Sequence, residues 1–381
     1  MIRIFLFYNL IYLMNKMMKR RKFLSKAITT TTMVGAGGAL LSCADNGEKK
    51  TSPEAVNINF NKNYRWNMVT TWPPNFPVVG EGCIMMAQWI EKMSGGRLKI
   101  NVNGGGELIP PLECFDAVSN GAVEMGHGVA YYWAGKVPAA QFFGAVPFGM
   151  NANQSYSWII SGEGGKLWEE IYEPFDLLPI TCGNTGVQMG GWFNRDINSV
   201  ADLKGLKMRI PGLGGKVFNK AGGTAVLVSG NEVYTNLERG VIDATEWIGP
   251  YHDYKMGFYE VAKNYYYPGW HEPGATLELL INKTKLAELP SDLRQIVKTA
   301  AYRLNHWMGA EFDAKNAVYL NKLVNEEGVR LKEFPSEVLK TFHFHTQEAI
   351  AELTDKDPTS KKVYNSYSRF RESLQTWSSI S

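Results

Sequence analysis

Residues 64–69 (Tyr-Arg-Trp-Asn-Met-Val) and residues 98–103 (Leu-Lys-Ile-Asn-Val-Asn) alternate apolar and polar side chains. This alternation predicts two β-strands. Between them, the stretch from Pro77 to Met93 predicts a helix, which residues 94–96 (Ser-Gly-Gly) would end. A strand, a helix and a second strand at this spacing form a βαβ unit, so this part of the chain predicts a parallel sheet covered by helices.

The same alternation of strands and helices continues through the middle of the chain. Further strands are predicted at 123–129, 187–194, 207–210, 241–247 and 276–281, and further helices at 112–119, 216–221 and 232–239. The C-terminal third is helical, with predicted helices at 292–325, at 337–353 and after Pro358. The pattern predicts an α/β fold of two lobes with a ligand cleft between them and a helical C-terminal region.

We assign these segments to two lobes. Lobe I takes residues 61–185 and about 275–315, and lobe II takes residues 186–274 and about 316–381. Each lobe would then combine strands and helices from separate parts of the chain, because crossovers join the lobes.

One face of the last helix is apolar. Its residues are spaced at i, i+4, i+7, i+11 and i+14, namely Val363, Tyr367, Phe370, Leu374 and Trp377. This face packs either on the protein's own core or on the same helix of a second copy in a homodimer, and the sequence leaves both open.

The N-terminus has the pattern of an export signal. Residues 1–43 contain the pair Arg20-Arg21, typical of a twin-arginine leader, followed by a weakly apolar stretch. Residues 40–43 (Leu-Leu-Ser-Cys) are similar to a lipoprotein cleavage box, with Cys43 as the lipid-bearing residue. The polar residues 44–60 predict a flexible tether. We therefore expect a periplasmic protein anchored by a lipid at Cys43, with an ordinary signal peptide as the alternative.

Charge and cysteine content exclude several classes of protein. The formal net charge is +3, and no dense Lys/Arg stripe follows the leader, which argues against a nucleic-acid surface. Besides Cys43 the chain has Cys83, Cys114 and Cys182, without a CxxC pair, so neither a disulfide framework nor a zinc site is predicted. All three are expected to be small buried residues, and a Cys83–Cys114 bridge is left open.

Sequence motifs of common enzyme classes are missing. There is no GxSxG elbow, no phosphate-binding GxxxxGK[ST] loop and no HExxH pair. None of the six histidines has a second ligand at metal-site spacing. The sequence therefore gives no local support for an enzyme, although Ser, Asp and His are plentiful and a dispersed triad is left open.

Three stretches resemble the extracytoplasmic solute-binding proteins of tripartite ATP-independent periplasmic (TRAP) transporters. They are residues 111–127, 197–212 and 237–247, and the second contains Asp202-Leu-Lys-Gly-Leu-Lys-Met-Arg209-Ile-Pro-Gly212. The resemblance extends from Tyr64 to the C-terminus and implies the two-lobed periplasmic binding protein fold. Residues 186–193 and 244–247 resemble the branch of that family that binds 2-oxo and 2-hydroxy monocarboxylates through a metal ion.

The resemblance implies a site for a carboxylate and a cation. It makes Arg209 the carboxylate donor, a role suited to a planar, permanently charged, bidentate guanidinium. It also implies that Gln188 and Glu246 supply side-chain oxygens and Trp247 its main-chain carbonyl to a cation. Hard cations such as Na⁺ and Ca²⁺ prefer such oxygen ligands, and the sequence does not choose between the two ions.

The rest of the expected pocket is aromatic and polar. Trp72, Tyr131, Tyr132, Asn231 and Trp270 lie in segments expected to face the cleft. Aromatic walls exclude water, and tyrosine hydroxyls can orient a ligand oxygen. For Tyr131 and Trp270, burial in the core is an equal alternative.

The resemblance thus predicts a receptor that captures a pyruvate-like or lactate-like carboxylate for import by integral membrane permease subunits. Its two lobes would close over the ligand. An exported enzyme acting on a small carboxylic acid, or a binding subunit of a sensory system, are the alternative functions.

Overall fold

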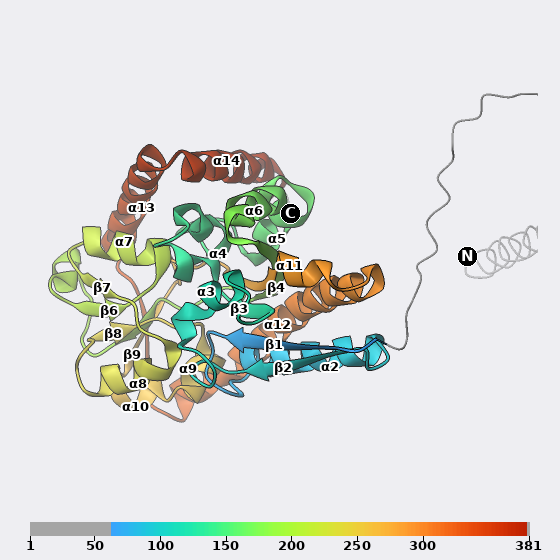
Figure 1. The fold of residues 1–381 in the computed structure, drawn as a ribbon. Helices are drawn as coiled ribbons and strands as arrows, with labels where there is room; N and C mark the ends of the chain where they lie inside the picture. The colour runs from blue at the N-terminus through green and yellow to red at the C-terminus, as the bar shows by residue number, and fades with distance from the viewer. Residues whose placement is uncertain (1–61, 379–381) are drawn as a thin grey trace, which may run out of the picture. The chain divides into compact units, whose positions relative to one another are not determined.

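The computed structural model describes residues 62–378 (Figure 1). The predicted leader at 1–43, its Cys43 and the predicted tether at 44–60 lie outside the described residues.

The first sheet has the strand order β2-β1-β3-β10-β4 and contains the predicted βαβ unit. Its strands are β1 (Tyr64–Thr70), β2 (Leu98–Asn103), β3 (Met125–Gly128), β4 (Leu177–Asn184) and β10 (Thr276–Asn282). Strand β1 pairs in parallel with both β2 and β3. Strand β10 is antiparallel to β3 and β4. We call this sheet A.

The second sheet, called sheet B, has the strand order β11-β9-β5-β8-β6-β7. Its strands are β5 (Gly191–Phe193), β6 (Lys207–Arg209), β7 (Thr224–Val226), β8 (Ala244–Thr245), β9 (Asn264–Tyr267) and β11 (Arg330–Glu333). Strand β6 pairs in parallel with β7 and β8, whereas β5 is antiparallel to β8 and β9. Two mixed sheets with helices around them confirm the predicted α/β class.

Helices surround both sheets. The α-helices are α2 (Val79–Met93), α3 (Cys114–Ser119), α4 (Gln141–Gly144), α5 (Ala152–Ser161), α6 (Gly164–Tyr172), α7 (Gly212–Lys220), α8 (Gly230–Glu238), α9 (Pro250–Lys255), α10 (Phe258–Val261), α11 (Lys283–Ala287), α12 (Ser291–Asn325), α13 (Ser336–Lys356) and α14 (Pro358–Ser378). Short 3₁₀ turns lie at η1 (Pro111–Glu113), η2 (Ala130–Trp133), η3 (Pro138–Ala140), η4 (Glu173–Phe175) and η5 (Val200–Leu203). Within 62–378, no helix combines the length and the apolar character needed to span a bilayer.

Helices pack on both sheets, and one core cluster, which includes Met68 of β1 and Tyr265 of β9, extends from sheet A to sheet B. Helices α2 and α12 pack on sheet A around Met68, Ile90 and Leu304. Helices α7 and α13 pack together beside sheet B. The cysteines predicted to be small and buried, Cys83, Cys114 and Cys182, are buried and free, so the Cys83–Cys114 bridge is not formed.

The prediction of a strand at 187–194 was wrong for its first half. Only residues Gly191–Phe193 are a strand, and residues 185–190 form an irregular connection from sheet A to sheet B. The reason is that Gly190 donates its N–H to the carbonyl of Tyr266, whereas Gln188 donates to that of Glu272, which belongs to another irregular segment. Gln188 is thereby placed between the sheets.

The predicted helix at 77–93 begins two residues later, at Val79. Val78 has φ 59° and ψ −63°, and Val79 donates its N–H to the carbonyl of Pro77 at 2.7 Å. These angles describe a strained γ-turn, which is rare for a β-branched residue. The Pro77 carbonyl also accepts a hydrogen bond from His252 Nε2 of α9, at 2.7 Å. Packing around the turn therefore overrides the local helical pattern.

The apolar face of α14 packs mainly on its own chain. Val363 and Tyr367 are buried, and the Tyr367 hydroxyl accepts a hydrogen bond from the Met150 N–H at 2.7 Å. Trp377, at the end of the same face, is 65% exposed. Helix α14 lies against α4, α5 and α6, which precede β4, rather than against sheet B (Figure 1). The lobe boundaries stay a prediction, and α14 is the segment where the packing departs from them.

A buried carboxyl in sheet A predicts a pH dependence of stability. Glu278 on β10 accepts hydrogen bonds from Trp133 Nε1 and, at 3.1 Å, from the Tyr172 hydroxyl, and it is fully buried. Burial raises its pKa from an ordinary 4.5 to about 8. The folded protein therefore holds this proton more tightly than the unfolded chain does. Its stabilising contribution is complete below about pH 4.5, declines as the pH rises and is lost above about pH 8.

We expect Glu278→Gln to remove the part of the pH dependence of stability that comes from this carboxyl. Between pH 5 and pH 8 the wild-type free energy of unfolding should fall relative to the variant by on the order of 1 kcal/mol per pH unit. Urea unfolding of both proteins at several pH values measures the difference. Parallel profiles for the two proteins would contradict the assignment.

Candidate functional site

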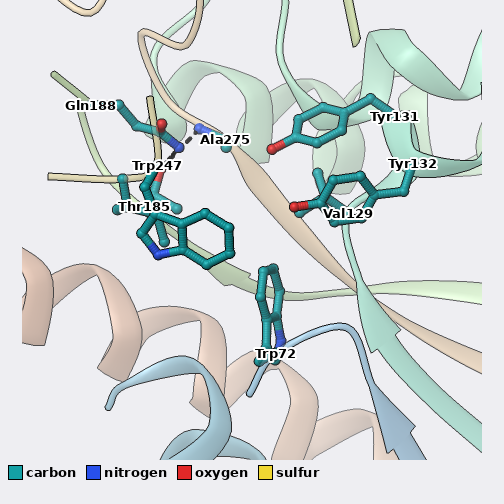
Figure 2. Close-up of a pocket in the computed structure, with 9 residues that line it drawn as sticks. Trp72, Val129, Tyr131, Tyr132, Thr185, Gln188, Trp247 and Ala275 are labelled. Atoms are coloured by element: carbon teal, nitrogen blue, oxygen red, sulfur yellow. Dashed lines mark hydrogen bonds between the residues drawn. The ribbon is translucent and has the colours of Figure 1, made fainter. Parts of the chain in front are cut away.

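A pocket lies where strands of both sheets end (Figure 2). Its lining residues follow the carboxyl ends of β1, β3, β4 and β8, or precede β10, and are Trp72, Val129, Tyr131, Tyr132, Thr185, Gln188, Trp247, Ile248 and Ala275. In open α/β sheets, the crevice outside the carboxyl ends of the strands is where ligands bind. Five of the nine had been predicted from the sequence, namely Trp72, Tyr131, Tyr132, Gln188 and Trp247.

An arginine and a glutamate form a buried ion pair next to the pocket, although neither is among the residues that line it. Arg209 is the last residue of β6, and its Nη1 donates to Glu246 Oε1. The two side chains are 2% and 1% exposed. Arg209 Nη2 also donates to the Tyr132 hydroxyl at 3.3 Å, and its guanidinium lies 5.0 Å from the centre of the Trp247 ring. Since a buried charge needs a partner of opposite charge, Glu246 offsets the cost of burying the Arg209 guanidinium next to the pocket.

Two further residues gather around Glu246. His271 Nε2 donates to Glu246 Oε2 at 3.2 Å, and Glu272 accepts from Gln188 Nε2 at 2.6 Å. One ligand atom each of Glu246, His271 and Glu272 lies within 4.8 Å of the other two. Burial, and then the charge of Glu246, raise the pKa of Glu272 well above its ordinary value. Two carboxyl groups this close and this buried favour either a shared proton or a cation between them.

The donor atoms at this position fit a hard cation. Gln188 Oε1 is buried and has no hydrogen-bond partner. Among residues 62–378, no donor contacts the main-chain carbonyl oxygen of Trp247. With the carboxylates of Glu246 and Glu272, these atoms form a set of oxygens of the kind that Na⁺ and Ca²⁺ take as ligands.

The aromatic walls are held in defined orientations. Trp72 Nε1 donates to His127 Nδ1 at 2.8 Å, and His127 Nε2 donates to the carbonyl of Cys182 at 3.1 Å. Burial lowers the pKa of His127 to about 4, so the ring is neutral and its one proton lies on Nε2. Figure 2 shows the Tyr131 and Tyr132 rings side by side, with their hydroxyl oxygens directed toward the space beside Trp247.

Two residues predicted to face the cleft do not line this pocket. Asn231 on α8 donates through Nδ2 to the carbonyl of Gly105, in the loop after β2, at 2.9 Å. It thereby connects a helix beside sheet B to a loop of sheet A. Trp270 stacks on Phe342 of α13 with 4.2 Å between the ring centres, in the core beside sheet B. For Trp270 the structure corresponds to the core alternative.

Sequence reasoning missed Glu272 and its neighbour His271. They are 26 and 25 residues after Glu246 and carry no motif or spacing that marks a metal site. The sequence contained one indication that these two residues lie near the site. His271 and Glu272 directly follow Trp270, which the sequence had placed near the cleft, and an acidic residue there could have been added to the oxygen donors.

Most of the chain matches a family of known proteins. Residues 68–357 match the profile of the family described as bacterial extracellular solute-binding protein, family 7. The chain is 40% identical over 363 residues to a monocarboxylate 2-oxoacid-binding periplasmic protein of Nostoc sp.. The match covers 95% of this chain and 96% of that protein.

Solved structures of similar proteins hold a cation and pyruvate. A TRAP periplasmic solute-binding protein from Pseudoalteromonas atlantica, with bound sodium and pyruvate, has a TM-score of 0.82 and 40% identity. The match covers 84% of this chain and 97% of that one. A protein of the same description from Colwellia psychrerythraea, with bound calcium and pyruvate, has a TM-score of 0.80 and 38% identity, over 84% of this chain and 98% of that one.

Proposed function

Because the chain belongs to family 7 of the bacterial extracellular solute-binding proteins, the receptors of TRAP transporters, we propose that it captures a small 2-oxo or 2-hydroxy monocarboxylate. In this proposal Arg209 and a bound Na⁺ or Ca²⁺ ion hold the solute. Family membership makes the chain a solute-binding receptor and not an enzyme, so the alternative of an exported enzyme is dropped.

One observation carries the proposal. Gln188 and Trp247 line the pocket with two unused oxygen acceptors, Gln188 Oε1 and the Trp247 carbonyl. The buried Arg209 lies beside them, in contact with the Trp247 ring. A carboxylate next to a 2-oxygen presents two oxygens on one edge and one further oxygen beside it. A guanidinium on one side and a cation on the other match that arrangement of negative charge.

Different residues would bind the carboxylate, bind the cation and exclude water. Arg209 would donate two parallel hydrogen bonds to the carboxylate, and the Tyr131 and Tyr132 hydroxyls would orient its oxygens. Gln188, Glu246 and the Trp247 carbonyl would hold the cation, and we add Glu272 to this set because of its distance to Glu246. When bound, the cation supplies the positive charge that allows a carboxylate to lie beside Glu246. Trp72 and Trp247 would exclude water.

Members of this family are periplasmic receptors that work with integral membrane permease subunits. Export by the twin-arginine leader and lipid attachment at Cys43 stay proposals. So does a homodimer through α14, for which the exposed Trp377 at the end of its apolar face is the available contact. A sensory role would use the same pocket with a different partner protein. Uptake of labelled solute by vesicles that contain the permease would separate transport from sensing.

Calorimetric titration tests the proposal. The metal-stripped protein would be titrated with pyruvate, lactate, a branched 2-oxo acid and a dicarboxylic acid, each without cation, with Na⁺ and with Ca²⁺. We expect cation-dependent binding of the monocarboxylates. Equally tight binding of a dicarboxylate without any cation would contradict the proposed metal site and leave the receptor assignment in place.

A further inference from the structure

The peptide unit between Trp247 and Ile248 is fixed from one side only. Strand β8 ends at Thr245, and the chain runs without regular structure until α9 begins at Pro250. Within this run the Ile248 N–H donates to Asp253 Oδ1 at 3.3 Å. A trans peptide is planar, and its N–H and C=O point in opposite directions. Asp253 therefore determines the direction in which the Trp247 carbonyl points.

Asp253 is itself held by two aromatic donors. It is 1% exposed, and its Oδ2 accepts hydrogen bonds from Trp192 Nε1 at 2.9 Å and from the Tyr265 hydroxyl at 2.7 Å. Trp192 on β5 and Tyr265 on β9 are opposite each other in sheet B. Their rings stack with 4.0 Å between centres. The carboxylate is thus attached to the rigid part of sheet B rather than to a surface loop.

The next peptide unit ties the same segment to a second proposed ligand. The carbonyl of Ile248 accepts a hydrogen bond from the N–H of Met189 at 3.1 Å. Met189 follows Gln188, whose Oε1 is buried without a partner. Both polar groups of Ile248 are therefore used, one toward Asp253 and one toward the segment that carries Gln188.

We propose that Asp253 is a positioning residue for the cation site, because it aims the Trp247 carbonyl and, through Ile248, sets that oxygen relative to Gln188. The proposal rests on the proposed function, in which the Trp247 carbonyl is a cation ligand. Asp253 does not touch the pocket and acts only through the 247–248 peptide. Partners of this kind, which orient the direct ligands, change metal affinity about 10- to 100-fold when they are removed.

The substitution Asp253→Asn tests the role with almost no change in volume. Ile248 N and Trp192 Nε1 can only donate, whereas an asparagine has one accepting oxygen and one donating NH₂. One of the two donors must then face the NH₂ group. We expect the affinity for Na⁺ or Ca²⁺, titrated at a fixed concentration of pyruvate, to fall about 10- to 100-fold. Burial raises the pKa of Asp253 to about 7, so titrations at pH 8 keep the wild-type carboxylate ionised.

A second variant shows whether weaker cation binding in Asp253→Asn comes from a misdirected Trp247 carbonyl or from a general loss of stability. Trp192→Phe removes the competing donor, so in the double variant Trp192→Phe/Asp253→Asn the amide oxygen can face Ile248 while the NH₂ donates to the Tyr265 hydroxyl. We expect the double variant to bind the cation more tightly than Asp253→Asn alone, although Trp192→Phe lowers the unfolding midpoint. Glu278→Gln is the matched control, because Glu278 has the same kinds of partner, a Trp Nε1 and a Tyr hydroxyl, outside the pocket.

Each result has one meaning. Wild-type affinity for the cation in Asp253→Asn, or a double variant no better than Asp253→Asn, overturns the positioning role. Loss of cation affinity in Asp253→Asn with recovery in the double variant supports it. If the wild-type protein does not bind pyruvate in the presence of Na⁺ or in the presence of Ca²⁺, the proposed function is overturned, and with it the role of Asp253.

Discussion

Replacing Arg209 with lysine is expected to weaken binding of a monocarboxylate by about a hundredfold, or roughly 3 kcal/mol. The guanidinium of Arg209 contacts Glu246, the Tyr132 hydroxyl and the face of Trp247 at the same time. A lysine ammonium is a single point charge that keeps the pairing with Glu246 but cannot also present two parallel donors to a carboxylate. Lysine rather than alanine is the informative change, because alanine would leave Glu246 buried without a partner.

Calorimetry with pyruvate at a saturating cation concentration measures the effect. Arg97→Lys is the matched control. Arg97 is also a buried arginine, it pairs with Asp292 at the start of α12, and it is not part of the pocket. This control should lower stability and leave pyruvate binding unchanged. Pyruvate affinity in Arg209→Lys within a few-fold of wild type would mean that another group receives the carboxylate.

Glu246→Gln is expected to abolish the dependence of carboxylate binding on the cation. In the wild type a carboxylate that enters without a cation meets the negative charge of Glu246, and Arg209 is already paired with it. The glutamine variant removes that repulsion and also removes a charged ligand of the cation. Cation-free binding should therefore become tighter than in the wild type. The enhancement by Na⁺ or Ca²⁺ should fall from at least about tenfold to none, since one lost charged interaction is worth 1.4 kcal/mol or more.

Paired titrations of pyruvate with and without each ion give both numbers for each protein. Glu278→Gln makes the same chemical change at an equally buried position and should keep the wild-type cation dependence. A Glu246→Gln protein whose affinity still rises with the cation as in the wild type would exclude Glu246 from the cation site.

Local patterns in the sequence predicted much of the fold. The alternation in residues 64–69 and 98–103 became β1 and β2, paired in parallel. The predicted helix boundaries of α12 and α13 were close to those observed. The strand predicted at 207–210 contains Arg209, and Arg209 is the last residue of the observed strand β6. These features depend on neighbours a few residues apart, which periodicity and turn residues report directly.

Local patterns failed where a distant segment decides the conformation. Helix α2 begins at Val79 because the strained turn at Val78 is held by His252, far along the chain. The segment around Gln188 alternates like a strand, but its hydrogen bonds go to the irregular segment at Glu272. In both cases tertiary packing outweighs local propensity.

By itself the sequence determined the fold class and the short strand that carries Arg209, and its resemblance to a family supplied Gln188 and Glu246 as candidate oxygen donors. Only the tertiary structure decided that Glu272 and His271 join Glu246, that Trp270 packs in the core, and that Asp253 orients the Trp247 peptide. The physical reason is that a polar side chain acquires a role from the groups around it. Those groups come from strands and loops that are neighbours in the sheets but far apart in the chain.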